Sequence, residues 1–385
     1  MSVTDDAFIP LFDLQIEEED VEAVAATLRS GWLTMGPRIA QLEEAFAGQL
    51  GCEHAVAVSS CTAALHLAYL AAGIGPRDEV IVPSYTFAAT AAAVLYCGGT
   101  PVFADVLGEH DLSIDPDHVA SLITPRTKAV ACVHFAGYAA PVRALRELCD
   151  AHGLALIEDV AHAPSATPVG SSRKLGTWGA AGCFSFFSNK VLPSGEGGLL
   201  ATGDEAVAAR ARSLRSHAMT SLTWERHRGH AESYDIVDLG FNYRLDEPRA
   251  ALLLSRLPRL DDEIAARRRL TLRYRELLAG VPGVVVPYRD DEVLTSSCYV
   301  MPVLVDADRR DDLRIALRER HGVQTSLFYP PVHRFTAYRE RFPDVRLPRT
   351  EAIAAREVTI PLFAHMTEAQ QARVVAALSA ELAGA

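Results

Sequence analysis

AGCFSFFSNKVLPSGEGG, residues 181–198, is the segment from which the organisation of this chain follows. An apolar run from Cys183 to Phe187 opens it and is typical of a buried β-strand, and the glycine-rich turn 195–198 closes it. Lys190 lies between them, so we expect its amine at the end of a buried strand. Loss of water there lowers the pKa of a lysine, which suits an amine that attacks a carbonyl. Alone, the pattern also fits a solvated loop lysine.

The upstream segment LIEDVAHA, residues 156–163, favours the buried position. Residues 155–157 have the composition of a buried parallel strand, and Glu158, Asp159 and His162 come at its carboxyl end, where ligands bind in α/β sheets. An acid at one strand end and a lysine at the next form the pair that pyridoxal 5'-phosphate (PLP) uses. The aspartate keeps the pyridine nitrogen protonated, and the lysine forms a Schiff base.

These motifs resemble, in the same order, those of the DegT/DnrJ/EryC1/StrS aminotransferases. The matching segments are IEDVAHA at 157–163, SFFSNK at 185–190 and GEGG at 195–198, and the resemblance runs from about Leu11 to the C-terminus. It implies a fold type I PLP-dependent transferase, with PLP on Lys190 and the pyridoxamine form (PMP) as an intermediate form. The implied fold is an α/β three-layer sandwich with a mostly parallel seven-stranded sheet, followed by a smaller C-terminal α+β domain.

The alternation of strand and helix patterns predicts the same sheet, covered by helices on both faces. The expected strands are 55–59, 79–83, 101–104, 129–134, 154–157, 182–187 and 198–201, with helices at 61–72, 88–97 and 141–151. We place a large PLP-binding domain at residues 1–250 and a small domain at 251–385, entered by a long helical stretch, 246–279. In the small domain we expect strands at 298–305 and 322–329 and helices at 309–320 and 367–383.

Ser60, Cys61 and Thr62 lie where the first strand turns into a helix, and free N–H groups there form an anion site. Simple capping of the helix is the alternative. The family has Ser-Gly-Thr here, holding the PLP phosphate. Cys61 replaces the glycine but keeps the amide. Ser185 is, by resemblance, a second phosphate ligand.

Three further residues are cofactor contacts by resemblance. Phe87, rather than Tyr85, matches the aromatic that stacks on the pyridine ring. His162 is expected near the ring and its 3-hydroxyl, and we count it with Lys190 and Asp159 as catalytic. Asn242, in the segment LGFNYR, matches an asparagine that contacts the phosphate of the other subunit, although it is also suited to capping a helix. The resemblance therefore implies a homodimer with shared active sites.

Three stretches are candidates for substrate contacts, with ordinary loops as the alternative. They are SGWLTMGPR at 30–38, the Arg- and His-rich segment 217–230, and FYPPVH at 328–333. By resemblance the second reaches the neighbouring active site, where it would bind the diphosphate of a nucleotide-sugar. The candidate residues are Trp32, Thr34, Met35, Arg226, His227, Arg228, His230, Tyr329 and His333.

Composition excludes several other classes of protein. The 385 residues carry 37 basic and 49 acidic side chains, a net charge of -12, with no basic tract for nucleic acid or an anionic membrane. No signal peptide and no apolar run of transmembrane length is expected. Seven scattered cysteines without a CxxC motif predict reduced thiols and a cytoplasmic protein, and no metal site is expected.

The sequence thus predicts an aminotransferase that moves an amino group from L-glutamate or L-glutamine to a keto-sugar. By resemblance the acceptor is a nucleotide-linked 3- or 4-keto-6-deoxysugar, in amino-sugar, antibiotic or surface-polysaccharide biosynthesis. A cyclitol ketone of an aminoglycoside-type pathway is an alternative acceptor. A sugar dehydratase is disfavoured, because such relatives replace the lysine with histidine. A non-catalytic sensor on the PLP fold is the alternative from another class, and the intact Lys190, Asp159 and Ser185 argue against it.

Overall fold

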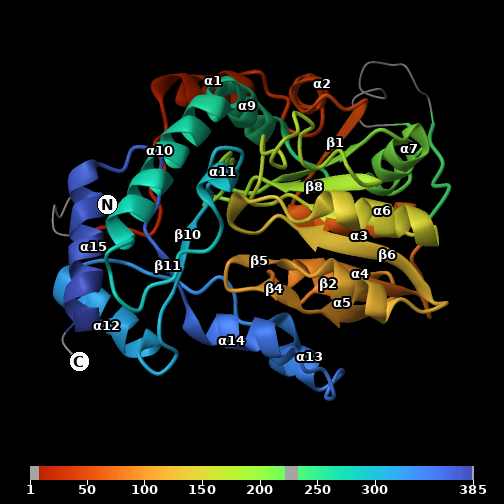
Figure 1. The fold of residues 1–385 in the computed structure, drawn as a ribbon. Coiled ribbons are helices and arrows are strands. Elements are labelled where there is room, and N and C mark those ends of the chain that lie inside the picture. The colour runs from red at the N-terminus through yellow and green to blue at the C-terminus, as the bar shows by residue number, and fades with distance from the viewer. Residues whose placement is uncertain (1–7, 222–232, 384–385) are drawn as a thin grey trace.

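A computed structural model describes residues 8–221 and 233–383 of the chain. Two helices come first, α1 (Glu18–Arg29) and α2 (Pro37–Leu50), and a large sheet follows them (Figure 1). Its strand order is β1-β9-β8-β7-β6-β2-β3. The strands are β1 (His54–Val58), β2 (Glu79–Pro83), β3 (Thr100–Ala104), β6 (Thr127–Val133), β7 (Ala155–Asp159), β8 (Ala181–Ser185) and β9 (Gly198–Thr202).

This sheet confirms the predicted fold class and all seven predicted strands. Its pairs are parallel except those of β9, which runs antiparallel to both β1 and β8. The strands are short apolar runs, and most of their residues are buried because helices cover both faces.

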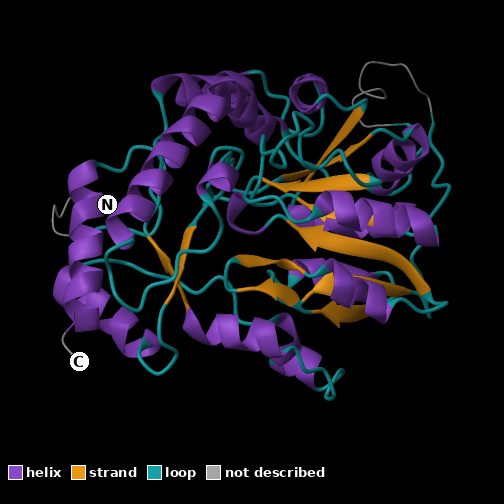
Figure 2. Cartoon of the chain, in the orientation of Figure 1, coloured by secondary structure: helices purple, strands orange, loops and turns teal. Residues whose placement is uncertain are grey.

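The two faces carry separate apolar cores, so the sheet is the middle layer of three (Figure 2). One face packs on α3 (Cys61–Ala71), α4 (Ala89–Tyr96) and α7 (Glu205–Leu214). The other packs on α2, α5 (Pro116–Leu122) and α6 (Val142–His152). Because β-strand side chains alternate, successive residues such as Val56 and Ala57 of β1 enter opposite cores.

A short hairpin, β4 (Val106–Gly108) and β5 (Asp111–Ile114), was not predicted. The C-terminal part contains α12 (Arg310–His321) and α15 (Glu368–Ala383), which confirm two predicted helices. Its remaining elements are α11 (Asp290–Val293), α13 (Thr336–Arg339), α14 (Pro348–Arg356), β10 (Met301–Leu304) and β11 (Glu357–Ile360). In Figure 1 α12 and α15 lie at the end of the molecule away from the large sheet.

The predicted strand at 322–329 is wrong. This segment forms only two isolated bridges, between Val323 and Ile9 and between Ser326 and Thr359. Since these partners belong to different parts of the chain, no continuous ladder forms, and β11 is the strand that pairs antiparallel with β10.

The long helical stretch at 246–279 is also corrected, because it consists of two helices. They are α9 (Glu247–Arg256) and α10 (Leu260–Leu278), separated by a 3-10 turn, Leu257–Arg259. Pro258 lies within that turn, and proline has no N–H to continue an α-helical ladder.

Part of the C-terminal region packs on the large sheet. Val332, Tyr338 and Leu347 belong to the apolar core of α3 and α4. Thr350 donates its backbone N–H and its hydroxyl to Asp105, each at 2.7 Å. The division of the chain at residue 250 stays a prediction.

None of the helices in residues 8–221 and 233–383 has the length and apolar character to span a membrane. No group of His, Cys, Asp or Glu side chains in the same residues is arranged to hold a metal ion. All seven cysteines are free.

Candidate active site

The predicted catalytic residues lie at one edge of the sheet, where the parallel strands β7 and β8 end. Asp159 is the last residue of β7, and Lys190 lies in the turn after β8. That turn is closed by backbone hydrogen bonds from Phe186 N to Gly197 O (2.9 Å) and from Ser194 N to Phe186 O (2.8 Å). The sheet register thus brings the acid and the amine to one place, as the sequence predicts.

Asp159 is 5% exposed, and neutral donors surround its carboxylate. Thr90 Oγ1 donates to Oδ2 at 2.9 Å, Ala161 N donates to Oδ1 at 3.1 Å, and Cys61 Sγ lies 3.9 Å from Oδ1. Burial raises the pKa of Asp159, while these hydrogen bonds and the charge of Lys190 oppose the rise. No arginine pairs with this carboxylate among the described residues, so it is suited to a cationic partner such as a protonated pyridine.

Lys190 has the character expected of a reactive amine. Burial lowers the pKa of its ammonium group to about 8, and the nearby Asp159 and Cys61 oppose the shift. Its Nζ lies 3.4 Å from Tyr299 Oη and 4.4 Å from the centre of the Tyr299 ring. A large fraction of the amine is therefore neutral near pH 8 and able to attack a carbonyl.

The start of α3 offers an anion site. Ser60 caps the helix, accepting from Ala63 N at 3.1 Å. No acceptor in the described part of the chain bonds to the amides of Cys61 and Thr62. Gly198 packs so closely here that a Cβ would lie 2.5 Å from Cys61 N, so only glycine fits. The free amides and the positive helix end are suited to a phosphate.

His162 is buried and neutral. Its Nδ1 accepts from Ala136 N at 3.3 Å, so its proton is on Nε2, which donates to Tyr329 Oη at 2.9 Å. Burial and the charge of Lys190 hold the pKa of His162 well below its ordinary value. The structure thereby brings His162 and Tyr329, 167 residues apart in sequence, into direct contact.

Phe87 and Tyr85 lie in different environments. Tyr85 is buried against Phe135, with ring centres 5.0 Å apart, whereas Phe87 is 60% exposed and 6.0 Å from the Tyr329 ring. Phe87 therefore has an exposed ring near Tyr329, while its role as the aromatic that stacks on the pyridine ring stays a prediction.

Two further predicted cofactor ligands have accessible surface. Ser185, the last residue of β8, is partly exposed and accepts weakly from Phe187 N at 3.4 Å. Asn242 is exposed and forms an isolated bridge with Ser216. Neither residue forms a hydrogen bond with Lys190 or Asp159 among the described residues.

The candidate substrate segment around Trp32, Thr34 and Met35 is held in place by Glu247 of α9. The Glu247 carboxylate accepts from the backbone N–H groups of Gly36 (3.0 Å), Arg38 (2.9 Å) and Ile39 (3.0 Å) at the start of α2. Thr34 is exposed, Trp32 is partly exposed, and Met35 is buried. A cleft of about 780 Å³ opens beside Trp32.

His333 is placed differently from Tyr329. It is 2% exposed, and both ring nitrogens are occupied, Nδ1 by Ser84 Oγ at 2.7 Å and Nε2 by Glu351 at 3.0 Å. These contacts join the C-terminal region to the end of β2 and leave no ring nitrogen for a substrate. The predicted residues Arg226, His227, Arg228 and His230 lie outside the described residues.

Sequence reasoning missed Thr90 and Tyr299, which touch Asp159 and Lys190. Thr90 lies in α4, one turn after Thr86, and its Oγ1 also contacts Thr86 Oγ1 at 3.0 Å. Two threonines four residues apart after a strand could have indicated hydroxyl groups directed to the site. No sequence pattern pointed to Tyr299, because it is 109 residues from Lys190 and contacts it only in the folded chain.

The donor set fits PLP. It combines a buried carboxylate for the pyridine nitrogen, an amine of lowered pKa for the aldehyde, and two amides without an acceptor for the phosphate. The side chain of Cys61 points to Asp159, so it does not block the amides.

Comparison with known proteins gives consistent matches along the chain. The model of the DegT/DnrJ/EryC1/StrS aminotransferase family matches residues 14–379. SpsC, a spore coat polysaccharide biosynthesis protein of Bacillus subtilis (strain 168), is 38% identical over 369 residues, covering 94% of each chain. DesV of S. venezuelae, solved in complex with a ketimine intermediate, has a TM-score of 0.88 and 37% identity over 97% of this chain and 98% of its own. DesI, solved in the presence of its TDP-sugar product, has a TM-score of 0.84 and 35% identity, over 95% of this chain and 90% of its own.

Proposed function

The chain belongs to the DegT/DnrJ/EryC1/StrS aminotransferase family and is a PLP-dependent aminotransferase, and we propose that its amino acceptor is a nucleotide-linked keto-sugar. The acceptor class is a 3- or 4-keto-6-deoxysugar, and the donor is L-glutamate or L-glutamine. The product would serve amino-sugar, antibiotic or surface-polysaccharide biosynthesis. The TDP-sugar product of DesI and the polysaccharide role in the name of SpsC support this acceptor class.

The observation that carries the proposal is the pairing of Asp159 and Lys190 at adjacent strand ends, beside the free amides of α3. A ligand sensor has no need of an amine whose pKa is lowered to about 8 by burial. Transamination needs such an amine, because it must act as a nucleophile and then carry a proton near neutral pH.

Bound PLP supplies an electron sink that stabilises negative charge on the carbon losing a proton. Asp159 would hold the proton on the pyridine nitrogen, and Phe87 would face the ring. The amides of Cys61 and Thr62 and the hydroxyl of Ser185 would hold the phosphate.

Lys190 carries the proton in this proposal. Once free of a bound cofactor, its neutral amine would be the base that takes the proton from the donor's α-carbon and then the acid that gives it back. In the second half-reaction it works in reverse. His162, held neutral by burial, would not compete for this proton, and by resemblance it would lie near the pyridine ring and its 3-hydroxyl.

The substrate is assigned to surfaces around the site. Tyr329 is hydrogen-bonded to His162 beside the site, and Trp32, Thr34 and Met35 belong to the segment held by Glu247. His333 is the substrate candidate that the structure favours least, because both of its ring nitrogens are hydrogen-bonded to Ser84 and Glu351. Arg226, His227, Arg228 and His230 are kept as diphosphate ligands on resemblance alone.

The active unit in this proposal is a homodimer with shared sites. Asn242 is exposed and forms no hydrogen bond with Lys190 or Asp159 of its own chain, so it would be available to the phosphate bound by a second copy. Exposed apolar side chains precede it in sequence, among them Val237 and Leu239, which is 89% exposed. A cytoplasmic location remains part of the proposal.

The test is to convert the protein to its PMP form with L-glutamate or L-glutamine and then offer a panel of acceptors. The panel contains nucleotide-linked 3-keto- and 4-keto-6-deoxysugars and a cyclitol ketone, with the amine product measured by mass spectrometry. The Asp159→Asn variant is the control, since an amide does not keep the pyridine nitrogen protonated and turnover should fall severely. Amination of the cyclitol alone, or an absorbance spectrum that no amino donor changes, contradicts the proposal.

A further inference from the structure

The contact between Lys190 and Tyr299 has no place yet in the proposed reaction. Tyr299 lies just before β10, and its hydroxyl is the group that hydrogen-bonds to Lys190 Nζ, at 3.4 Å. No other side chain in residues 8–221 and 233–383 makes a hydrogen bond to this amine. The ammonium also lies 4.4 Å from the ring centre, within range of a cation–π interaction.

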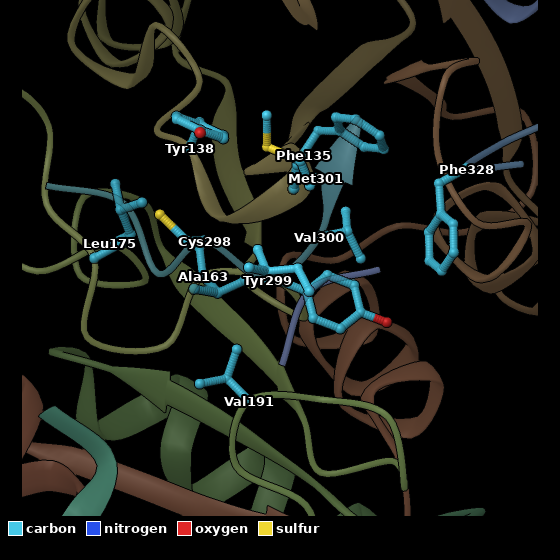
Figure 3. Close-up of a cluster of buried hydrophobic side chains, with 14 of the residues drawn as sticks. Phe135, Tyr138, Ala163, Leu175, Val191, Cys298, Tyr299, Val300, Met301 and Phe328 are labelled. Carbon is cyan, nitrogen blue, oxygen red and sulfur yellow. The ribbon is translucent and has the colours of Figure 1, made fainter. Parts of the chain in front are cut away.

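Tyr299 is held on every side. Its N–H donates to Ala136 O at 2.9 Å, and its carbonyl accepts from Arg267 Nη1 at 3.3 Å. Gly137, with φ of +100°, permits this approach, because a Cβ there would lie 3.0 Å from Tyr299 N. The ring packs 4.4 Å from the ring of His162. Figure 3 shows Tyr299 among the side chains of this buried cluster, with its hydroxyl at the end of the ring away from the backbone.

The chemistry of the phenol matches what a proton-carrying lysine needs. An ammonium donates hydrogen bonds, whereas a neutral amine also accepts them. A neutral phenol both donates and accepts hydrogen bonds, so it can bond to the ammonium form and to the neutral amine form of Lys190. Burial raises the pKa of Tyr299, which keeps the phenol neutral. A carboxylate in the same place would serve only the ammonium form.

We propose that Tyr299 is a positioning residue that holds Lys190 Nζ in place in both of its protonation states while the amine is free from the cofactor. The proposal rests on the proposed function, in which Lys190 is the proton carrier. In this proposal a residue of the C-terminal region positions the amine of a site that is otherwise built by the ends of β7 and β8.

The other charged groups near Lys190 do not replace this contact. Asp159 attracts the ammonium, and Cys61 and His162 lie close enough to influence the amine electrostatically. Lys190 also lines a cavity of about 300 Å³, where three carboxylates and three guanidinium groups balance one another. They are Glu17, Asp262, Glu263, Arg256, Arg259 and Arg267.

The test measures the pKa of the free Lys190 amine in the PMP form of the full-length protein. Trace acetic anhydride labels amines in proportion to their neutral fraction, and peptide mass spectrometry across a pH series follows each site. The chain has only three lysines, so Lys128 and Lys174 serve as internal references. The matched control is Tyr274→Phe, which removes an equally buried hydroxyl that contacts Met366 Sδ instead.

Tyr299→Phe should lower the pKa of Lys190 by about 0.5–1 unit, because hydrogen bonds from a charged donor are roughly twice as strong as neutral ones. The acid limb of kcat/KM for the acceptor should move to lower pH by the same amount, since the neutral amine is the active form. Tyr274→Phe should move neither. Tyr299→Leu, which also removes the ring, should lower the pKa of Lys190 at least as far.

A purely structural role predicts a lower kcat with an unmoved acid limb, so an unchanged Lys190 pKa in both Tyr299 variants overturns the proposal. Borohydride reduction of the wild-type PLP form separates this result from failure of the proposed function. Cofactor trapped on Lys190 with no pKa change rejects the role of Tyr299 alone. Cofactor trapped on Lys128 or Lys174 rejects both.

Discussion

Replacing Glu158 with glutamine should destabilise the fold by several kilocalories per mole. Glu158 is fully buried beside Asp159, and four donors share its carboxylate. Trp178 N (2.6 Å) and Gly179 N (2.7 Å) donate to Oε1. Gly176 N (2.7 Å) and His134 Nε2 (3.1 Å) donate to Oε2. A glutamine turns one oxygen into an NH₂ group, which then faces two donors.

The affected donors have no alternative partner nearby. His134 does not reverse its tautomer without a penalty, because its Nδ1 already accepts from Ala140 N at 3.1 Å. Two lost hydrogen bonds to a charged acceptor cost about 1.5–3 kcal/mol each, so the free energy of unfolding falls by about 3–6 kcal/mol. At about 2.1 cal/mol/K per residue, the 385-residue chain has an unfolding entropy of about 0.8 kcal/mol/K. The Tm should therefore fall by about 4–7 °C.

Differential scanning calorimetry of wild type and variant in the same cofactor state measures this shift. Glu53→Gln is the matched control, because that side chain is 76% exposed and its loss should change Tm by less than about 1 °C. The Glu158→Gln protein should still show the absorbance of bound PLP at low temperature, since Glu158 and Asp159 point to opposite faces of β7. A Tm within 1 °C of wild type would refute the argument that this carboxylate anchors the 176–179 turn.

Three other outcomes are expected. Lys190→Ala should lose the absorbance of covalently bound PLP and all turnover, and measurable transamination by this variant would rule out Lys190 as the proton carrier. Mixing equal amounts of Lys190→Ala and the bulky Asn242→Trp variant should recover about a quarter of wild-type activity, because about half of freely exchanged dimers are mixed and each has one intact site. No recovery despite subunit exchange shown by native mass spectrometry counts against shared sites. Burial raises the pKa of Glu357 to about 8. Because the folded pKa lies above the unfolded one, stability is lost as pH rises from about 5 through 8, by about 1–2 °C in Tm per pH unit. Glu357→Gln, which keeps an acceptor for Phe328 N, should flatten that decline, and parallel Tm curves for the two proteins would contradict this assignment.

The sheet and the core of the site could be predicted because their signals are local. Each of the seven strands is a short apolar run ended by a turn, and alternation with helices indicated parallel pairing. Asp159 ends one such strand and Lys190 lies in the turn after another, so placing the strands also placed the residues. The two errors, at 322–329 and within 246–279, arose where a local pattern competed with tertiary pairing or with Pro258.

Contacts between segments that are distant in sequence could not be predicted from these local patterns. Tyr299 meets Lys190 across 109 residues, Glu247 holds the 36–39 backbone across more than 200, and His333 joins Ser84 across 249. No periodicity encodes such meetings, because they depend on how strands are ordered in the sheet and how the C-terminal region folds back on it. The sequence therefore predicts which groups perform the chemistry, whereas the folded chain decides which neighbours set their pKa values and hold them still, since burial and hydrogen bonding exist only after packing.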